Sequence, residues 1–210
     1  MGFTKNVKKS FRLLFSPGRE SAAKMDVMGA LKFYYGASLI PLLLFLVFGF
    51  IAMKLGVFSG VLGMFPATSS FMMNAGLNVL LVGFALVYFW LLVPIGFFID
   101  AALYQLVGKY FLKLFKEDYE RTFTAMVFGC MPMLLLYWLF VIPGVNLLAF
   151  VVLPVWALVT EVIALSVQQK ITRLQSVAAM AVLAGLAVLV VLLIVYVGAL
   201  AFNVLPLAAR

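Results

Sequence analysis

The chain has 210 residues, of which 67% are hydrophobic and only 10% are charged, and its formal net charge is +8. A water-soluble domain of this length could not cover so much apolar surface with so few charges, so the composition predicts an integral membrane protein. The absence of histidine excludes His-based catalytic triads and HExxH zinc sites, and the single Cys130 excludes an internal disulfide.

The first 32 residues form a basic segment, predicted to be cytoplasmic, whose stretch FTKNVKKSFRLLF favours an amphipathic helix over residues 3–15. The predicted apolar face holds Val7, Phe11, Leu14 and Phe15, and the predicted basic face holds Lys5, Lys8, Lys9 and Arg12. Such a helix lies in the plane of the lipid headgroups with its apolar face toward the acyl chains. The alternative is a basic tail that follows only the rule that positive charge stays inside.

Five apolar runs follow, each long enough for a membrane helix of about 20 residues. They cover Phe33–Met53, Asn78–Leu106, Thr122–Ile142, Leu147–Gln168 and Val177–Val204. The sequence therefore predicts an all-α helix bundle, with a five-span transmembrane domain over residues 33–204 and a short outer tail at 205–210. Pro143-Gly144 predicts a tight turn that joins the third and fourth spans as an antiparallel hairpin. The only long outer connection is expected at residues 54–77.

All but two of the 15 Lys and Arg residues fall on one side of the predicted membrane, and the exceptions are Lys54 and Arg210. Because basic residues are retained on the cytoplasmic side, this bias predicts a cytoplasmic N-terminus and an outer C-terminus. A second membrane-surface element is predicted at residues 109–120, where aromatic residues alternate with Lys109, Lys113 and Lys116. The expected partner is a bilayer with anionic headgroups rather than nucleic acid.

Two acidic residues, Asp100 and Glu161, fall within the predicted spans. Counting back from the next lysine along each span places both carboxyl groups roughly 13 Å inside the cytoplasmic boundary. An acidic residue at the centre of a span costs about 3 kcal/mol, so an internal partner is expected. Pro41 and Pro132 fall near the same level and free backbone carbonyls there. The sequence therefore predicts an inward-facing polar layer of these four residues.

Three interpretations of the two carboxylates stay open: a proton-bridged clamp between helices, an ion or proton site, and carboxylates on unrelated faces. In the fifth span, Ala181 and Gly185 form a small-xxx-small pair that favours close helix packing, either within the monomer or between two copies. The chain carries no recognisable catalytic motif, so we expect no catalytic residues, no metal site and no cofactor.

The stretch KEDYERTFTAMVFGCMPMLLLYWLFVIPGVNLLAFVVLPVWALVTEVIALSVQQ, residues 116–169, resembles the core of the Yip (Ypt-interacting protein) family of five-span membrane proteins. The resembling features are Tyr119, Arg121-Thr122-Phe123, Pro132, Ile142-Pro143-Gly144 and Trp156, and FRLLFSPGRE at residues 11–20 is similar to the entry segment of prokaryotic members. For eukaryotic members, the resemblance implies proteins of early secretory membranes that bind Rab-class GTPases and assist vesicle trafficking. Those proteins carry a long cytoplasmic N-terminal region, so the 32 residues here favour a prokaryotic member.

We therefore expect a non-enzymatic integral membrane protein of a prokaryotic cell membrane, which organises or remodels membrane or binds a protein partner at its cytoplasmic face. The alternative is a small transporter or channel that uses Asp100 and Glu161 for protons or cations, and a third class is a membrane-embedded enzyme. A polar path from one face to the carboxylates would favour transport. A closed bundle with a basic, aromatic cytoplasmic surface would favour the first function.

Overall fold

The computed structural model describes residues 3–54 and 83–208, and no strand occurs within these ranges. In chain order the elements are α1 (Phe3–Phe15), α2 (Pro17–Glu20), α3 (Val27–Lys54), η1 (Tyr88–Leu92), α6 (Val93–Gln105), η2 (Leu106–Phe111), α7 (Tyr119–Gly129), α8 (Met131–Leu136), η3 (Tyr137–Val141), α9 (Asn146–Gln169) and α10 (Arg173–Ala208). Within the described ranges, five helices are long and apolar enough to cross a membrane, as predicted. The first begins at Val27 rather than Phe33. Residues 55–77 of the predicted outer loop lie outside the described residues.

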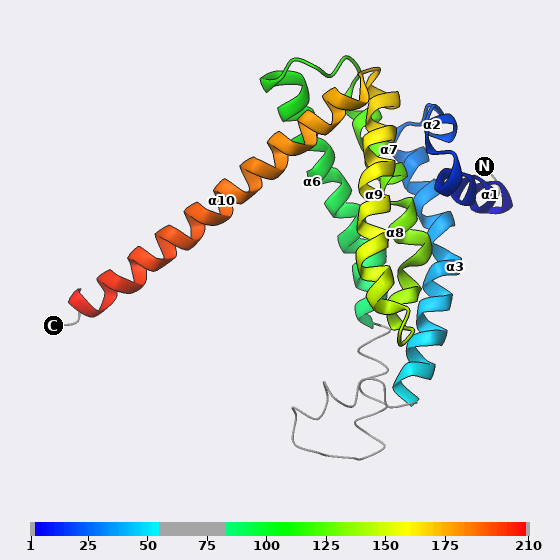
Figure 1. Cartoon of the computed structure of the whole chain (residues 1–210), viewed down its shortest axis with the longest axis horizontal. Coiled ribbons are helices and arrows are strands. Elements are labelled where there is room, and N and C mark those ends of the chain that lie inside the picture. The colour runs from blue at the N-terminus through cyan, green and yellow to red at the C-terminus, as the bar shows by residue number, and fades with distance from the viewer. Residues whose placement is uncertain (1–2, 55–82, 209–210) are drawn as a thin grey trace.

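The first four spans stand side by side in a bundle (Figure 1). The lysines that each end carries distinguish its two ends. We call the end that carries Lys109, Lys116 and Lys170 the basic end, and the end that carries Lys54 the opposite end. The core lies around α7, where the rings of Phe123 and Phe128 are fully buried. A buried centre of this kind follows from the position of α7, in which every residue from 122 to 129 is buried.

The second span shows how the bundle accommodates proline. Pro94 cannot donate a backbone hydrogen bond, and the preceding turn widens into the π-helix η1. The carbonyl of Trp90 accepts a hydrogen bond from the Tyr35 hydroxyl (3.0 Å), and that of Phe89 accepts one from the Tyr34 hydroxyl (2.5 Å). Two tyrosines of α3 thus supply partners for carbonyls of the second span, and in an apolar environment such carbonyls need a partner within the protein.

The third span is broken rather than bent at its proline. Pro132 lies in the first turn of α8, where its missing N–H costs nothing, and α7 ends at Gly129 just before it. The span then tightens into the 3₁₀ helix η3 and reverses direction at Gly144, whose φ of +79° suits glycine. The predicted Pro143-Gly144 turn is therefore present, and α9 returns against α8 and η3.

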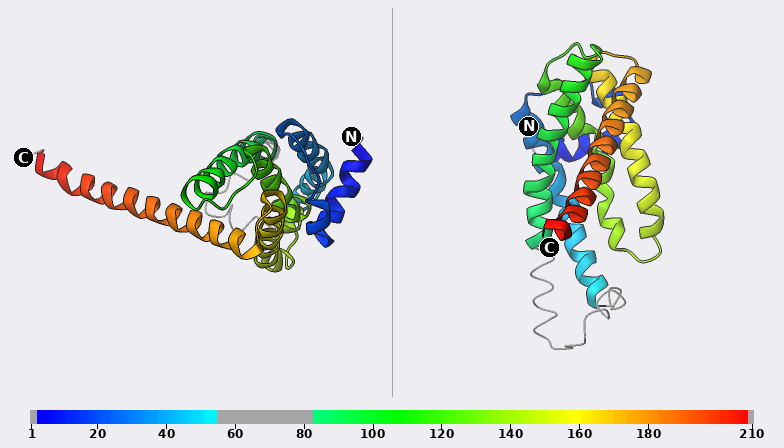
Figure 2. Two further views of the ribbon diagram at one scale, coloured as in Figure 1. Left: turned by 90° about the horizontal axis from the view of Figure 1, so that it is seen from above. Right: turned by 90° about the vertical axis from the view of Figure 1, so that its left-hand side faces the viewer.

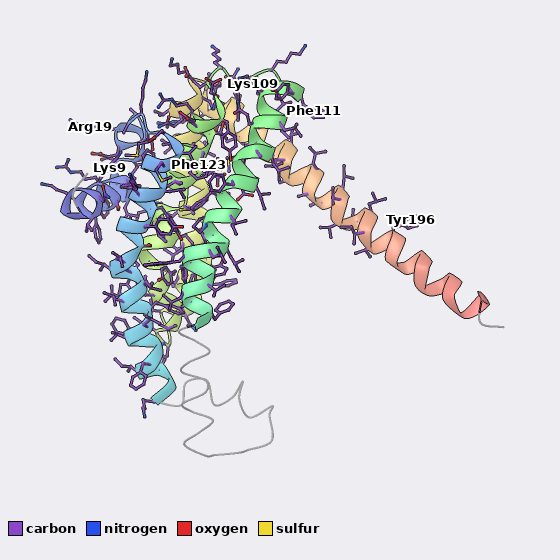
Figure 3. The ribbon with its side chains drawn as sticks, turned by 180° about the vertical axis from the view of Figure 1, so that it is seen from behind. Lys9, Arg19, Lys109, Phe111, Phe123 and Tyr196 are labelled. Carbon is purple, nitrogen blue, oxygen red and sulfur yellow. The ribbon has the colours of Figure 1, made fainter. Side chains whose placement is uncertain are left out.

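The fifth span leaves the bundle. Beyond its first turns α10 runs away from the other spans at a wide angle, and Tyr196 lies far from them (Figures 1 and 3). With 36 residues the helix is about 54 Å long, which exceeds the hydrocarbon core of about 30 Å and allows strong tilt. Nothing within the described residues would touch a Cβ on Gly185. The small-residue pair therefore brings no helix close at Gly185, and a packing role there stays a prediction.

Candidate functional site

The two intramembrane carboxylates line one groove, which we call the carboxylate groove. It lies between α6, α9 and the first turns of α10 and has a volume of about 670 Å³. Asp100 and Tyr104 enter it from successive turns of α6, and Glu161 enters it from α9. All other lining side chains are apolar. The carboxylates are thus on a shared surface, and the prediction of unrelated faces does not describe the arrangement.

The predicted polar layer is formed only in part. Pro41 and Pro132 are buried elsewhere in the bundle and do not line the carboxylate groove. Asp100 is exposed and Glu161 is half-buried, because the divergence of α10 leaves the groove open at its side. The expectation of two enclosed, inward-facing carboxylates is therefore wrong for Asp100. Within the described residues, no group of three or more Cys, Asp or Glu side chains is placed to hold a metal ion.

Glu161 is held in place by a close helix crossing. A Cβ added to Gly129 would lie 2.8 Å from both the Cα and the Cβ of Glu161, so α7 and α9 touch backbone to backbone at this point. Only glycine permits such an approach. Cys130 follows directly, and its thiol donates to the carbonyl of Val127 (3.2 Å). The packing of α7 against α9 consequently fixes the backbone of Glu161, and its carboxylate faces the Tyr104 hydroxyl across the groove.

A closed ring of four hydrogen bonds joins the spans at the basic end, and we call it the glutamine ring. Thr122 donates to Gln105 (2.6 Å), Gln105 donates to the carbonyl of Glu117 (3.1 Å), the Glu117 N–H donates to Gln169 (3.1 Å), and Gln169 donates to Thr122 (2.8 Å). The side chains of Gln105, Thr122 and Gln169 are buried. Buried polar groups that are fully paired hold neighbouring helices in one arrangement. The ring thus fastens α6, α7 and α9 around residues 112–118.

Ion pairs and a second glutamine surround this ring. Lys170 contacts Glu117 at 2.5 Å, and this hydrogen bond lowers the pKa of the Glu117 carboxyl below its ordinary value. Lys109 contacts Asp118 at 3.3 Å. Gln168 donates to the carbonyls of Ser21 and Ala23, which ties the segment between α2 and α3 to α9. Two lysines of the basic end, Lys109 and Lys170, therefore form ion pairs within the protein.

Residues 109–120 do not form a separate amphipathic helix. The second span continues through η2 to Phe111, and the chain then folds back so that the Phe115 ring lies over Gly108. Tyr110 and Phe111 remain 69% and 72% exposed. Lys113 and Lys116 are exposed as well, so the end of this span presents aromatic and basic side chains together (Figure 3).

The N-terminal helix α1 crosses the outside of the bundle over α3 and α8 (Figure 2). Leu13 and Leu14 face the bundle and are buried, together with Asn6 and Ser10. The predicted apolar face is therefore split, because Leu14 packs on protein while Phe11 and Phe15 are 47% and 78% exposed. The Phe15 ring lies edge-on to Trp156 of α9, with 6.4 Å between the ring centres. A hydrophobic periodicity cannot tell a lipid-facing position from a protein-facing one.

Lys9 was expected at the membrane surface, but it lies where α1 meets the bundle (Figure 3). Its ammonium nitrogen is 4.5 Å from the centre of the Phe128 ring and 5.4 Å from that of Phe33, which are cation–π distances. It has no hydrogen-bond partner among the described residues, and burial lowers the pKa of the Lys9 ammonium. Lys8 is exposed, whereas Arg12 faces Glu20 at 3.8 Å. The side chain of Lys5 lies outside the described residues.

Comparison with known proteins adds no family. No family model, no curated protein and no solved structure matches the chain.

Proposed function

We propose that the chain is a non-enzymatic integral membrane protein, similar to the Yip class, that organises or remodels membrane at the cytoplasmic face of a prokaryotic cell. The single observation that carries the proposal is the docking of α1. Lys9, Leu13 and Leu14 fix the helix to the bundle, while Phe11 and Phe15 stay exposed, Phe15 at the edge of the Trp156 ring of α9. A helix held in this way presents a fixed apolar wedge rather than a loose tail.

The depth of α1 suits insertion into one leaflet. A Cβ on Gly36 would lie 2.9 Å from the Asn6 amide nitrogen, so α1 crosses α3 at this residue, roughly 13 Å from the start of α3 at Val27. The membrane-length part of α3 has 26 residues and is about 39 Å long, which is about 9 Å more than the hydrocarbon core. The crossing then falls roughly 9 Å below the hydrocarbon boundary, and interfacial helices lie at about 5–10 Å.

The wedge can be tested with the whole protein reconstituted into vesicles of phosphatidylethanolamine and anionic phosphatidylglycerol. Transfer of each aromatic side chain into the acyl region contributes about 1.5–3 kcal/mol, so the double variant Phe11→Ser, Phe15→Ser should lose most of the wedge. Electron cryo-microscopy should show small, strongly curved vesicles with the native chain and a return toward the diameters of protein-free vesicles with this variant. The variant Leu147→Ser, Phe150→Ser is the matched control, because it removes exposed apolar side chains at the opposite end. Equal vesicle diameters for native chain and wedge variant would refute the proposal.

Transport is the second candidate, and the shared carboxylate groove is the observation that favours it. Its apolar lining and the glutamine ring at the basic end argue against a polar path, so we expect no proton flux above that of protein-free liposomes. A pH-sensitive dye inside proteoliposomes measures this flux. A native flux well above that level, abolished by Glu161→Gln and retained by the control Glu20→Gln, would establish the transport function instead.

A further inference from the structure

A second cavity lies in the half of the bundle toward the opposite end. It has a volume of about 340 Å³, within the range of small-molecule sites. Its walls come from three spans and include the rings of Phe45, Phe84, Tyr88, Phe89 and Tyr137. No charged side chain lines it. It is separate from the carboxylate groove and shares no lining residue with it.

One polar group of this cavity lacks a partner. Tyr137 is only 4% exposed, and its hydroxyl has no hydrogen-bond partner among the described residues. A buried hydroxyl without a partner costs free energy, so a ligand that accepts its hydrogen bond would be stabilised. The neighbouring Tyr34 and Tyr35 hydroxyls, in contrast, are both bonded to carbonyls. The Tyr137 hydroxyl is therefore a free donor beside a space whose other lining residues are apolar except for Tyr88 and Cys130.

The walls are fixed by local irregularities of two spans. Phe89 and Tyr88 belong to the π-helix η1, which the bonds from Tyr34 and Tyr35 hold in place. Tyr137 begins the 3₁₀ helix that follows the break at Cys130. The Phe89 and Tyr137 rings stack with their centres 4.0 Å apart. Single π-helical turns inside α-helices occur often at functional sites.

We propose that this cavity binds an uncharged, lipid-soluble molecule with a planar ring and a carbonyl acceptor, of the quinone or aryl ketone class. The aromatic walls provide stacking partners for the ring, and the Tyr137 hydroxyl donates a hydrogen bond to the carbonyl. The lack of charged lining residues disfavours an ionic ligand. Such a molecule reaches the cavity from the bilayer, and no redox step is involved.

The test uses benzophenone photolabelling of the full chain in lipid nanodiscs, with labelled peptides mapped by mass spectrometry. Fluorenone competes as a planar aryl ketone, and fluorene is the matched ring without the carbonyl. We expect saturable labelling within residues 84–93 or 130–140, with fluorenone about three- to tenfold more potent than fluorene, the value of one neutral hydrogen bond. Tyr137→Phe should erase this difference, whereas the control Tyr110→Phe, whose ring is exposed at the basic end, should preserve it.

Tyr137→Phe removes a hydroxyl that bonds to nothing described, so thermal unfolding should show that this variant keeps its fold. Val93→Phe places a larger side chain in the cavity wall and should reduce benzophenone labelling below that of the native chain. Equal competition by fluorene and fluorenone would mean that any apolar molecule, such as an acyl chain, fills the space, and would overturn the proposal. Absence of saturable labelling in these two segments would overturn it as well, as would a fluorenone preference that survives in Tyr137→Phe.

Discussion

Replacement of Gly129 by alanine should destabilise the protein by about 1–3 kcal/mol, because the added Cβ meets backbone and not the end of a flexible side chain. The contact would be 2.8 Å to the Cα of Glu161, so α7 and α9 must separate to accept it. The helices α7 and α9 belong to two central spans, and their separation should also displace the Glu161 carboxylate. Unfolding in mixed detergent micelles should therefore show a clearly lower free energy of unfolding than that of the native chain.

Gly96→Ala is the matched control for this change. Gly96 lies on α6, and nothing described lies within 4 Å of a Cβ at that position. Alanine is favoured over glycine in a helix by about 1 kcal/mol, so this variant should be unchanged or slightly more stable. Similar stabilities of the two variants would show that the α7–α9 crossing is looser than the geometry indicates.

Replacement of Gln169 by alanine should cost about 2–4 kcal/mol, because the side-chain amide both donates to Thr122 and accepts from the Glu117 N–H. Thr122 and the Glu117 N–H each lose a hydrogen bond at the basic end of the bundle, and the glutamine ring that joins α6, α7 and α9 is broken. The same unfolding assay measures the loss. Gln175→Ala serves as control, since Gln175 is half-buried and its side-chain oxygen accepts a hydrogen bond from the N–H of Thr172, the residue just before α10. A loss for Gln169→Ala no larger than that for Gln175→Ala would contradict a structural role of the ring.

The membrane-length helices could be predicted from the sequence because hydropathy is a local property. Each span is a run of apolar residues, and such a run can be identified without knowing which other helices pack against it. The turn at Pro143-Gly144 is local in the same way, since both residues restrict or free their own backbone. The partial success with Asp100 and Glu161 also has a simple origin. Both were placed by counting along helices, and helical rise is regular.

The glutamine ring could not be predicted, because Gln105, Thr122 and Gln169 are distant in the chain and individually unremarkable. Their one common feature is that each is an uncharged polar residue at the basic end of a span. Gly129 gave no signal either, since a glycine in an apolar span is common and its partner Glu161 lies on another helix. The outward course of α10 was equally hidden, because an apolar helix has the same sequence pattern whether it faces protein or lipid.

The central claim is that α1 is fixed to the bundle with Phe11 and Phe15 among the acyl chains of the cytoplasmic leaflet. The most direct measurement is spin-label accessibility in nanodiscs, with single cysteines placed at Phe11, Phe15 and Lys116 in a Cys130→Ala background. We predict that labels at positions 11 and 15 collide with oxygen and are shielded from a water-soluble nickel chelate, and that the label at 116 shows the reverse. Nickel accessibility at 11 and 15 equal to that at 116 would place α1 in water and contradict the account.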